Sequence, residues 1–108
     1  MDIATLRERV QRGQYLVRSH AVIHALKEGF DRSHMVEAVM TGMIIEDYPE
    51  DERVLVSGKT SLAETRPIYL HVVCEYSDPN YIEFITAYIP DELQWEYPPM
   101  KRRRRSRR

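Results

Sequence analysis

Two histidines, His20 and His24, are the residues whose type and spacing first suggest chemistry. They lie four residues apart, about one turn of an α-helix, so both imidazoles would leave the same side of a helix. Such a pair could contribute two metal ligands, or it could supply an acid or a base for proton transfer. It could also belong to an ordinary helix surface, and spacing alone favours that third interpretation.

A metal site would need further ligands, and the sequence offers His71 and Cys74. These two residues are three positions apart in a stretch with strand character, so their side chains would point to opposite faces of a sheet. No acidic residue has a spacing that would complete the set. We therefore expect neither a metal ion nor another cofactor.

A catalytic interpretation rests on two places. His20 follows Ser19 at the start of a predicted helix, where the helix dipole and free amides favour anions such as phosphate. The second place is a predicted hairpin of strands 68–76 and 81–89 around the turn "SDPN". If the two strands pair through a loop of even length, odd positions of the first lie opposite even positions of the second. One face of the hairpin then carries Tyr69, His71, Val73, Phe84, Thr86 and Tyr88, and the other carries Ile68, Leu70, Val72, Cys74, Ile85 and Ala87. His71, Thr86 and Tyr88 would then form a polar cluster able to carry proton transfer.

The elements that position these groups follow from periodicity and capping. We expect a charged helix over 2–12, a helix after Ser19 that ends at Gly29, and a helix after Ser33 that ends at Gly42 in the same way. From Met43 the hydrophobic period changes to two, which indicates strands in "MIIEDYP", "RVLVSGK", "PIYLHVVCEY" and "YIEFITAYI". "QYLVRS" is a short extended or irregular piece. This order predicts an α+β fold, with N-terminal helices packed on a roughly four-stranded antiparallel sheet. The apolar stripe of the helices is Val22, Ile23, Leu26, Met35, Val36, Val39 and Met40.

Charge divides the chain into two parts. "KRRRRSRR" at the end holds seven of the 16 basic residues, which leaves nine basic and 17 acidic residues in 1–100. We expect a single domain over 1–97 and a disordered basic tail over 98–108. The tail is suited to RNA or another polyanion, although a solubilising end or a partner-binding tail explains the same composition. Trp95 and Tyr97 are expected to fold back over an apolar patch.

The remaining composition is that of an ordinary globular domain of 108 residues. No apolar run is long enough for a membrane helix, and "MDIATLRERV" does not resemble a signal peptide. The single cysteine, Cys74, cannot form an internal disulfide, so we expect a cytoplasmic protein without membrane contact. Arg53 and Lys59 flank predicted strands and could hold phosphate, or they could be solvated strand ends.

Several segments together carry a family resemblance: "SHA", "MVEAVMTGMIIEDYP", "RPIYLHVVCEY" and "FITAYIPDELQW". From about Ser19 to Trp95 the chain resembles an uncharacterised family of small bacterial domains, distantly similar to the BrnT- and RelE-like toxins. The resemblance implies a small α+β protein, an antitoxin partner and RNA cleavage without a metal. The recurring polar residues of that family fall on His20, Glu46, Asp47, Tyr48, His71, Thr86 and Tyr88.

The resemblance implies roles for these residues in a ribonuclease. His20 or His71 would take the proton of a ribose 2′-hydroxyl, and the other histidine or Tyr88 would protonate the leaving oxygen. Arg53 or Lys59 would hold the phosphate, together with His24, which stands where many members of the family have arginine. The alternative function is a non-catalytic binding module for a protein or nucleic acid, in which the histidines are structural.

Overall fold

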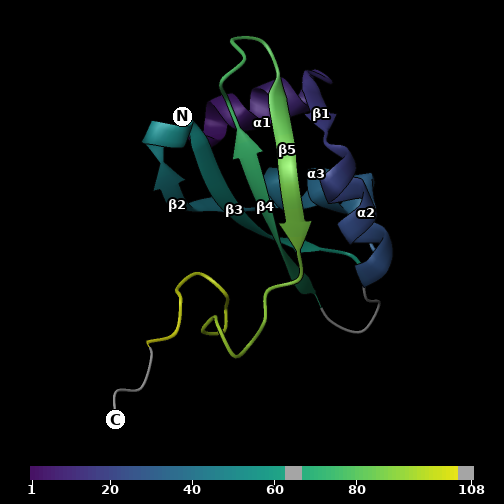
Figure 1. Cartoon of the computed structure of the whole chain (residues 1–108), viewed down its shortest axis with the longest axis vertical. Helices are drawn as coiled ribbons and strands as arrows, with labels where there is room; N and C mark the ends of the chain where they lie inside the picture. Colours follow the sequence, from purple (N-terminus) through teal and green to yellow (C-terminus); the bar gives the residue numbers. More distant parts are fainter. Residues whose placement is uncertain (63–66, 105–108) are drawn as a thin grey trace.

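The computed structural model describes residues 1–62 and 67–104 and confirms the α+β prediction, with three helices packed on one face of a mostly antiparallel sheet (Figure 1). The helices are α1 (Ile3–Gln11), α2 (Ser19–Glu28) and α3 (Arg32–Thr41). The strands are β1 (Tyr15–Val17), β2 (Met43–Tyr48), β3 (Arg53–Thr60), β4 (Ile68–Glu75) and β5 (Ile82–Tyr88), and a 3₁₀ turn, η1 (Pro49–Asp51), joins β2 to β3. Their order in the sheet is β1-β5-β4-β3-β2.

The sheet has one strand more than expected, because the segment after α1 is extended and joins the edge. β1 pairs in parallel with β5, with Tyr15 opposite Ile82 and Val17 opposite Phe84. The rings of Tyr15 and Phe84 stack with centroids 5.2 Å apart, which ties this short strand to its neighbour. Three residues are too few for hydrophobic alternation to indicate a strand.

Both ends of α3 differ from those expected. Asp31, not Ser33, caps α3: its carboxylate accepts from the Ser33 N–H at 2.9 Å, and the His34 ring accepts from the Asp31 N–H at 3.1 Å. Gly29 ends α2 in the left-handed conformation with φ 84°, as expected. Gly42 is extended instead, and it is required because a Cβ there would overlap backbone atoms of Ala38 and Ser57.

The hydrophobic core lies between the helices and one face of the sheet. Helix α2 contributes only its small residues, Ala21 and Ala25, and packs closely on β5. The predicted stripe is therefore wrong for this helix, since Val22, Ile23 and Leu26 are 42%, 55% and 74% exposed. On α3 the stripe is correct for Met35 and Val39, which are buried. The sheet contributes Val54, Val56, Leu70, Val72, Cys74, Ile82, Phe84 and Ala87.

Two β-bulges decide which side chains leave the core. Between Ile44 and Glu46 the β2–β3 register shifts by one residue, so Glu46 faces away from the helices although Ile44 faces them. A second shift places Phe84 opposite Cys74, so Phe84 lies in the core. The prediction that Phe84 shares a face with His71 is therefore wrong, because Ile85 is the extra residue of this bulge. We call the face of the sheet opposite the helices the outer face.

None of the helices in the described part of the chain has the length and apolar character needed to cross a membrane.

Candidate functional site

His71 and Tyr88 face each other on the outer face of the sheet. They are directly paired in the β4–β5 register, and Nδ1 of His71 lies 3.2 Å from the Tyr88 hydroxyl. Thr86 lies on the same face, opposite Val73, two residue pairs further along. The sequence prediction that His71, Thr86 and Tyr88 share a face is correct, because the bulge lies beyond them.

The chain after β5 covers His71. We call residues 90–104 the C-terminal segment. The ring of Trp95 meets the imidazole edge-on with centroids 4.5 Å apart, and the Pro99 carbonyl oxygen lies 2.7 Å from Nε2. A carbonyl only accepts, so Nε2 carries the hydrogen and a neutral ring accepts the Tyr88 O–H at Nδ1. His71 is 0% exposed in this arrangement, and both of its nitrogens have partners.

A second pair of charged groups lies beside this histidine. The guanidinium of Arg102 donates to both carboxylate oxygens of Glu46, at 2.8 and 3.1 Å, and the Tyr48 hydroxyl donates to the same carboxylate. Arg102 also lies over the Trp95 ring, 4.6 Å from its centroid. The bulge in β2 makes this arrangement possible, because regular alternation would turn Glu46 toward the helices.

The C-terminal segment is organised as a small hairpin of its own. Trp95 and Arg102 form an antiparallel bridge, the Arg103 N–H donates to the Gln94 carbonyl at 2.7 Å, and the Glu96 N–H donates to the Lys101 carbonyl at 2.9 Å. Trp95 is buried, as expected, and Pro99 is buried with it, whereas Tyr97 is exposed. Pro99 and Arg102, which lie in the predicted tail, therefore contact the sheet through His71 and Glu46. The rest of that prediction, 105–108, lies outside the described residues.

Burial and ion pairing set the protonation states of this cluster. Burial lowers the pKa of His71, so its imidazole is neutral at pH 7. Burial alone would raise the pKa of Glu46, but the hydrogen bonds from Arg102 and Tyr48 outweigh it, and the net pKa is lowered. Burial raises the pKa of Tyr88, which keeps the phenol protonated. The cluster thus holds a neutral base, a proton donor, a carboxylate and a fixed cation.

The other predicted histidines lie elsewhere. His20 and His24 are on α2, which packs on the helix-covered side of the sheet, and their rings are 6.3 Å apart. Nε2 of His24 lies 3.3 Å from the Glu28 carboxylate. The side chains of His71 and Tyr88 face the opposite way, so the structure does not bring the pair together with them. Nowhere in 1–62 or 67–104 do three or more His, Cys, Asp or Glu side chains form a group suited to a metal ion.

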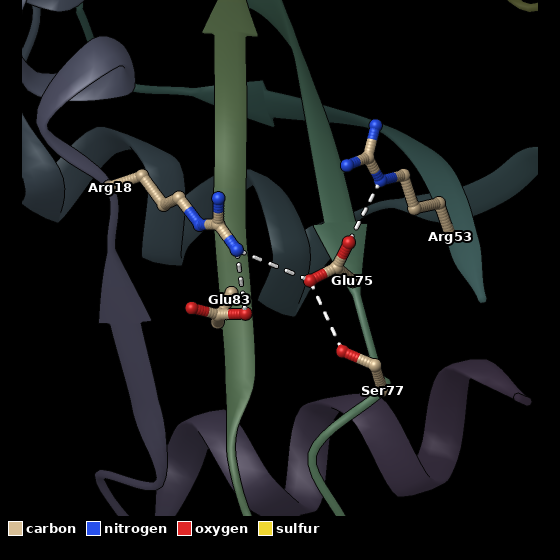
Figure 2. A network of polar contacts seen from close by, with 5 residues as sticks. All are labelled: Arg18, Arg53, Glu75, Ser77 and Glu83. Carbon is tan, nitrogen blue, oxygen red and sulfur yellow. Dashed lines mark hydrogen bonds and ion pairs between the residues drawn. The ribbon is translucent and has the colours of Figure 1, made fainter. Parts of the chain in front are cut away.

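The predicted phosphate-binding residues occupy different ends of the outer face. Arg53 donates to Glu75 at 3.1 Å within a network that also includes Arg18, Ser77 and Glu83 (Figure 2). The Glu75 carboxylate faces Arg53 on one side and Arg18, at 3.5 Å, on the other. Lys59 lies over the Tyr69 ring, 5.8 Å from its centroid. The structure therefore does not place Arg53 or Lys59 beside His71.

The cation beside His71 is Arg102, which sequence reasoning treated only as part of a charged tail. Its contact with Glu46 spans 56 residues of chain and depends on the packing of Trp95 and Pro99. The sequence gives one signal for Glu46 and Tyr48, which is their place in the "IIEDYP" segment that carries part of the family resemblance.

Comparisons with known proteins identify a family. No curated protein matches the chain, and no solved structure does. The sequence pattern of a family described as "Domain of unknown function (DUF4258)" matches residues 17–89, which include β2 to β5 with His71, Tyr88 and Glu46. The chain belongs to the DUF4258 family.

Proposed function

We propose that the outer-face cluster cleaves RNA without a metal ion and that the protein is the toxin-like member of a bacterial toxin–antitoxin pair. The observation that carries this proposal is the His71–Tyr88 hydrogen bond of 3.2 Å with the Arg102–Glu46 pair beside it. Cleavage of a ribose phosphodiester needs a base, an acid and a cation near the phosphate, and this cluster contains all three. The resemblance to RelE-like toxins agrees with this chemistry.

The proposed steps use the two directly bonded side chains. Once Pro99 has left, the imidazole takes the tautomer with hydrogen on Nδ1, which donates to the Tyr88 oxygen. Nε2 then takes the proton of the 2′-hydroxyl, and the 2′-oxygen attacks phosphorus. The bond from phosphorus to the 5′-oxygen breaks, and that oxygen takes the proton of Tyr88. His71 returns its Nδ1 proton to Tyr88, which leaves a 2′,3′-cyclic phosphate, a free 5′-hydroxyl and a neutral pair.

Arg102 and the C-terminal segment control access to this centre. Arg102 would hold the nonbridging phosphate oxygens, and Glu46 positions it in the resting protein through two hydrogen bonds. Because Pro99 occupies Nε2 of His71, residues 98–104 must lift before RNA can bind. Phosphates attract the basic residues 101–108, so RNA itself would favour lifting.

The test is incubation of the purified protein with total RNA in excess EDTA. Wild type should cleave, and Tyr88→Phe should slow cleavage by about 10²-fold, the lower range for loss of a general acid. Tyr81→Phe, an exposed tyrosine just before β5, is the matched control and should cleave normally. Circular dichroism would establish that both variants are folded. Equal rates for Tyr88→Phe and wild type would contradict the proposal.

The biological part of the proposal has a separate readout. Expression of the wild-type chain alone should arrest bacterial growth, and Tyr88→Phe should relieve the arrest. If the protein is folded and cleaves RNA but its expression does not slow growth, the toxin role is contradicted and the proposed ribonuclease activity is retained.

A second candidate function is a binding module without catalysis, and one observation favours it. His71 is 0% exposed with both nitrogens bonded, as expected of a histidine that holds the C-terminal segment in place. In that case His71→Asn would lower stability, and no variant would alter RNA. RNA binding without cleavage by the wild type would support this function.

A further inference from the structure

A pocket of about 140 Å³ lies between the start of β4, the end of β5 and the C-terminal segment. Its walls include the aromatic residues Tyr69, Trp95 and Tyr97 and the carboxylate-bearing residues Glu92 and Glu96. The proton transfers described above use none of these five residues. The lining of the pocket is mostly apolar with a few polar groups, as the linings of ligand sites usually are.

We propose that this pocket binds a guanine base, and that it selects the nucleotide beside the cleaved bond; this second part rests on the proposed ribonuclease function. The pocket shares Trp95 with the covering of His71, and Trp95 lies outside residues 98–104, which lift in the proposed function. A base held there would therefore lie next to the centre that acts on its ribose phosphate.

The aromatic walls favour a flat ligand. Tyr69 and Tyr97 meet edge to face, with centroids 5.7 Å apart and planes at 88°, so the two rings offer surfaces in different directions. Nucleobases stack readily on such rings, and apolar pockets bind a base that has left its stack. Lys59, 5.8 Å from the Tyr69 ring centroid, supplies a cation for the attached phosphate.

The carboxylates provide the selectivity for guanine. An ionised carboxylate only accepts hydrogen bonds, so it favours a base with adjacent donors. The Watson–Crick edge of guanine presents N1–H and an amino group side by side, and one carboxylate can accept from both. Adenine and cytosine each place an acceptor nitrogen beside their amino group, and uracil places its single N–H between two carbonyls. Beside Glu92 or Glu96, the acceptor nitrogens of adenine and cytosine and the carbonyls of uracil would face a carboxylate oxygen that also only accepts. These three bases would therefore bind less tightly than guanine.

Trp95 makes the test direct, because it is the only tryptophan of the chain and it lines the pocket. Titration of the full-length protein with GMP, AMP, CMP and UMP should change its fluorescence saturably. GMP should bind about tenfold more tightly than the other three, the discrimination expected of one bidentate pair. The basic tail attracts all four phosphates alike, so the comparison removes its contribution. Equal affinities, or no binding of GMP, would overturn the proposal.

Three variants then locate the selectivity. Glu92→Gln and Glu96→Gln are made separately, with Glu50→Gln in the exposed turn η1 as the control. At least one of the first two should weaken GMP about tenfold and leave AMP unchanged, since an amide cannot accept both hydrogen bonds. If both retain the wild-type preference for GMP, the assignment of the carboxylates is overturned.

The outcome also separates this inference from the proposed function. If GMP binds preferentially but RNA is not cleaved in EDTA, the guanine pocket is supported and the ribonuclease function is contradicted. RNA cleavage without preference for GMP, at positions unrelated to guanine, would retain the ribonuclease and remove the pocket.

Discussion

Replacement of Trp95 by alanine should release the C-terminal segment while the domain stays folded. Trp95 is 2% exposed and packs on the outer face against His71, but it is not part of the hydrophobic core between the helices and the sheet. Its loss therefore removes the main apolar anchor of residues 90–104 and leaves the core intact. Only the segment and the pocket that it lines should be lost.

The free energies of the individual contacts predict that the whole segment is released, not that it rearranges locally around the missing ring. Truncation of a buried tryptophan costs about 3–5 kcal/mol. The remaining anchors are weaker: the His71–Pro99 hydrogen bond is worth about 1 kcal/mol. The Arg102–Glu46 pair, with side chains 55% and 21% exposed, is worth less than about 1 kcal/mol after solvent screening. Together these two anchors contribute less than Trp95, so its loss removes most of the free energy that they jointly supply to hold the segment on the sheet.

Hydrogen exchange measures the result residue by residue. In the Trp95→Ala protein the amides of Glu96 and Arg103, which donate to backbone carbonyls of the same segment, should lose protection. Amides of β4 and β5 should remain protected. Trp95→Phe, which keeps an aromatic ring, is the control and should retain much of the protection. Full protection of Glu96 and Arg103 in Trp95→Ala would refute the reasoning, and so would loss of protection throughout β4.

Three more perturbations have definite expected outcomes. Gly58→Ala should lower the melting temperature by about 10 °C or more, because its Cβ would overlap the Ala38 backbone and separate α3 from β3; Lys59→Ala at the exposed neighbour should cost little. Burial lowers the pKa of His71 in the folded protein, so the unfolded chain binds the extra proton first. The free energy of unfolding in urea should therefore fall from about pH 7 to pH 5 in wild type, and fall less in His71→Asn. Burial raises the pKa of the Cys74 thiol, so a thiol reagent should label it only after unfolding, and rapid labelling of the native protein would contradict its 0% exposure.

Periodicity predicts those parts of the fold where side chains alternate without interruption. The antiparallel partnership of β4 and β5 follows from the "SDPN" turn, and so does the shared face of His71 and Tyr88. Alternation fails for Phe84 because a single extra residue, Ile85, reverses every side chain beyond it. The sequence carries no local mark of that bulge. Helix α2 fails for another reason, since close packing on β5 selects its alanines and leaves the larger residues in solvent.

The candidate site was predictable only in its strand-borne part. His71, Thr86 and Tyr88 are neighbours through one hairpin, so a local register argument reaches them. Arg102 meets Glu46 through the packing of Trp95 and Pro99 after the last strand, which no periodicity encodes. The orientation of Glu46 depends on the bulge in β2. Sequence reasoning therefore placed His71 and Tyr88 together on one face and did not connect Arg102 with them.

The charge division of the chain has a consequence within the proposed function. Residues 1–100 carry 17 acidic and nine basic side chains, so the acidic body attracts the basic end of its own chain. Arg102 uses its guanidinium to hold both oxygens of Glu46, and the same group cannot bind a phosphate in that way at the same time. Docking of residues 98–104 and capture of RNA by Arg102 are therefore mutually exclusive. By linkage, whatever stabilises the docked form of these residues lowers the affinity for RNA by the same factor. An acidic body, which looks unsuited to a protein that acts on RNA, then keeps His71 covered until a polyanion displaces residues 98–104.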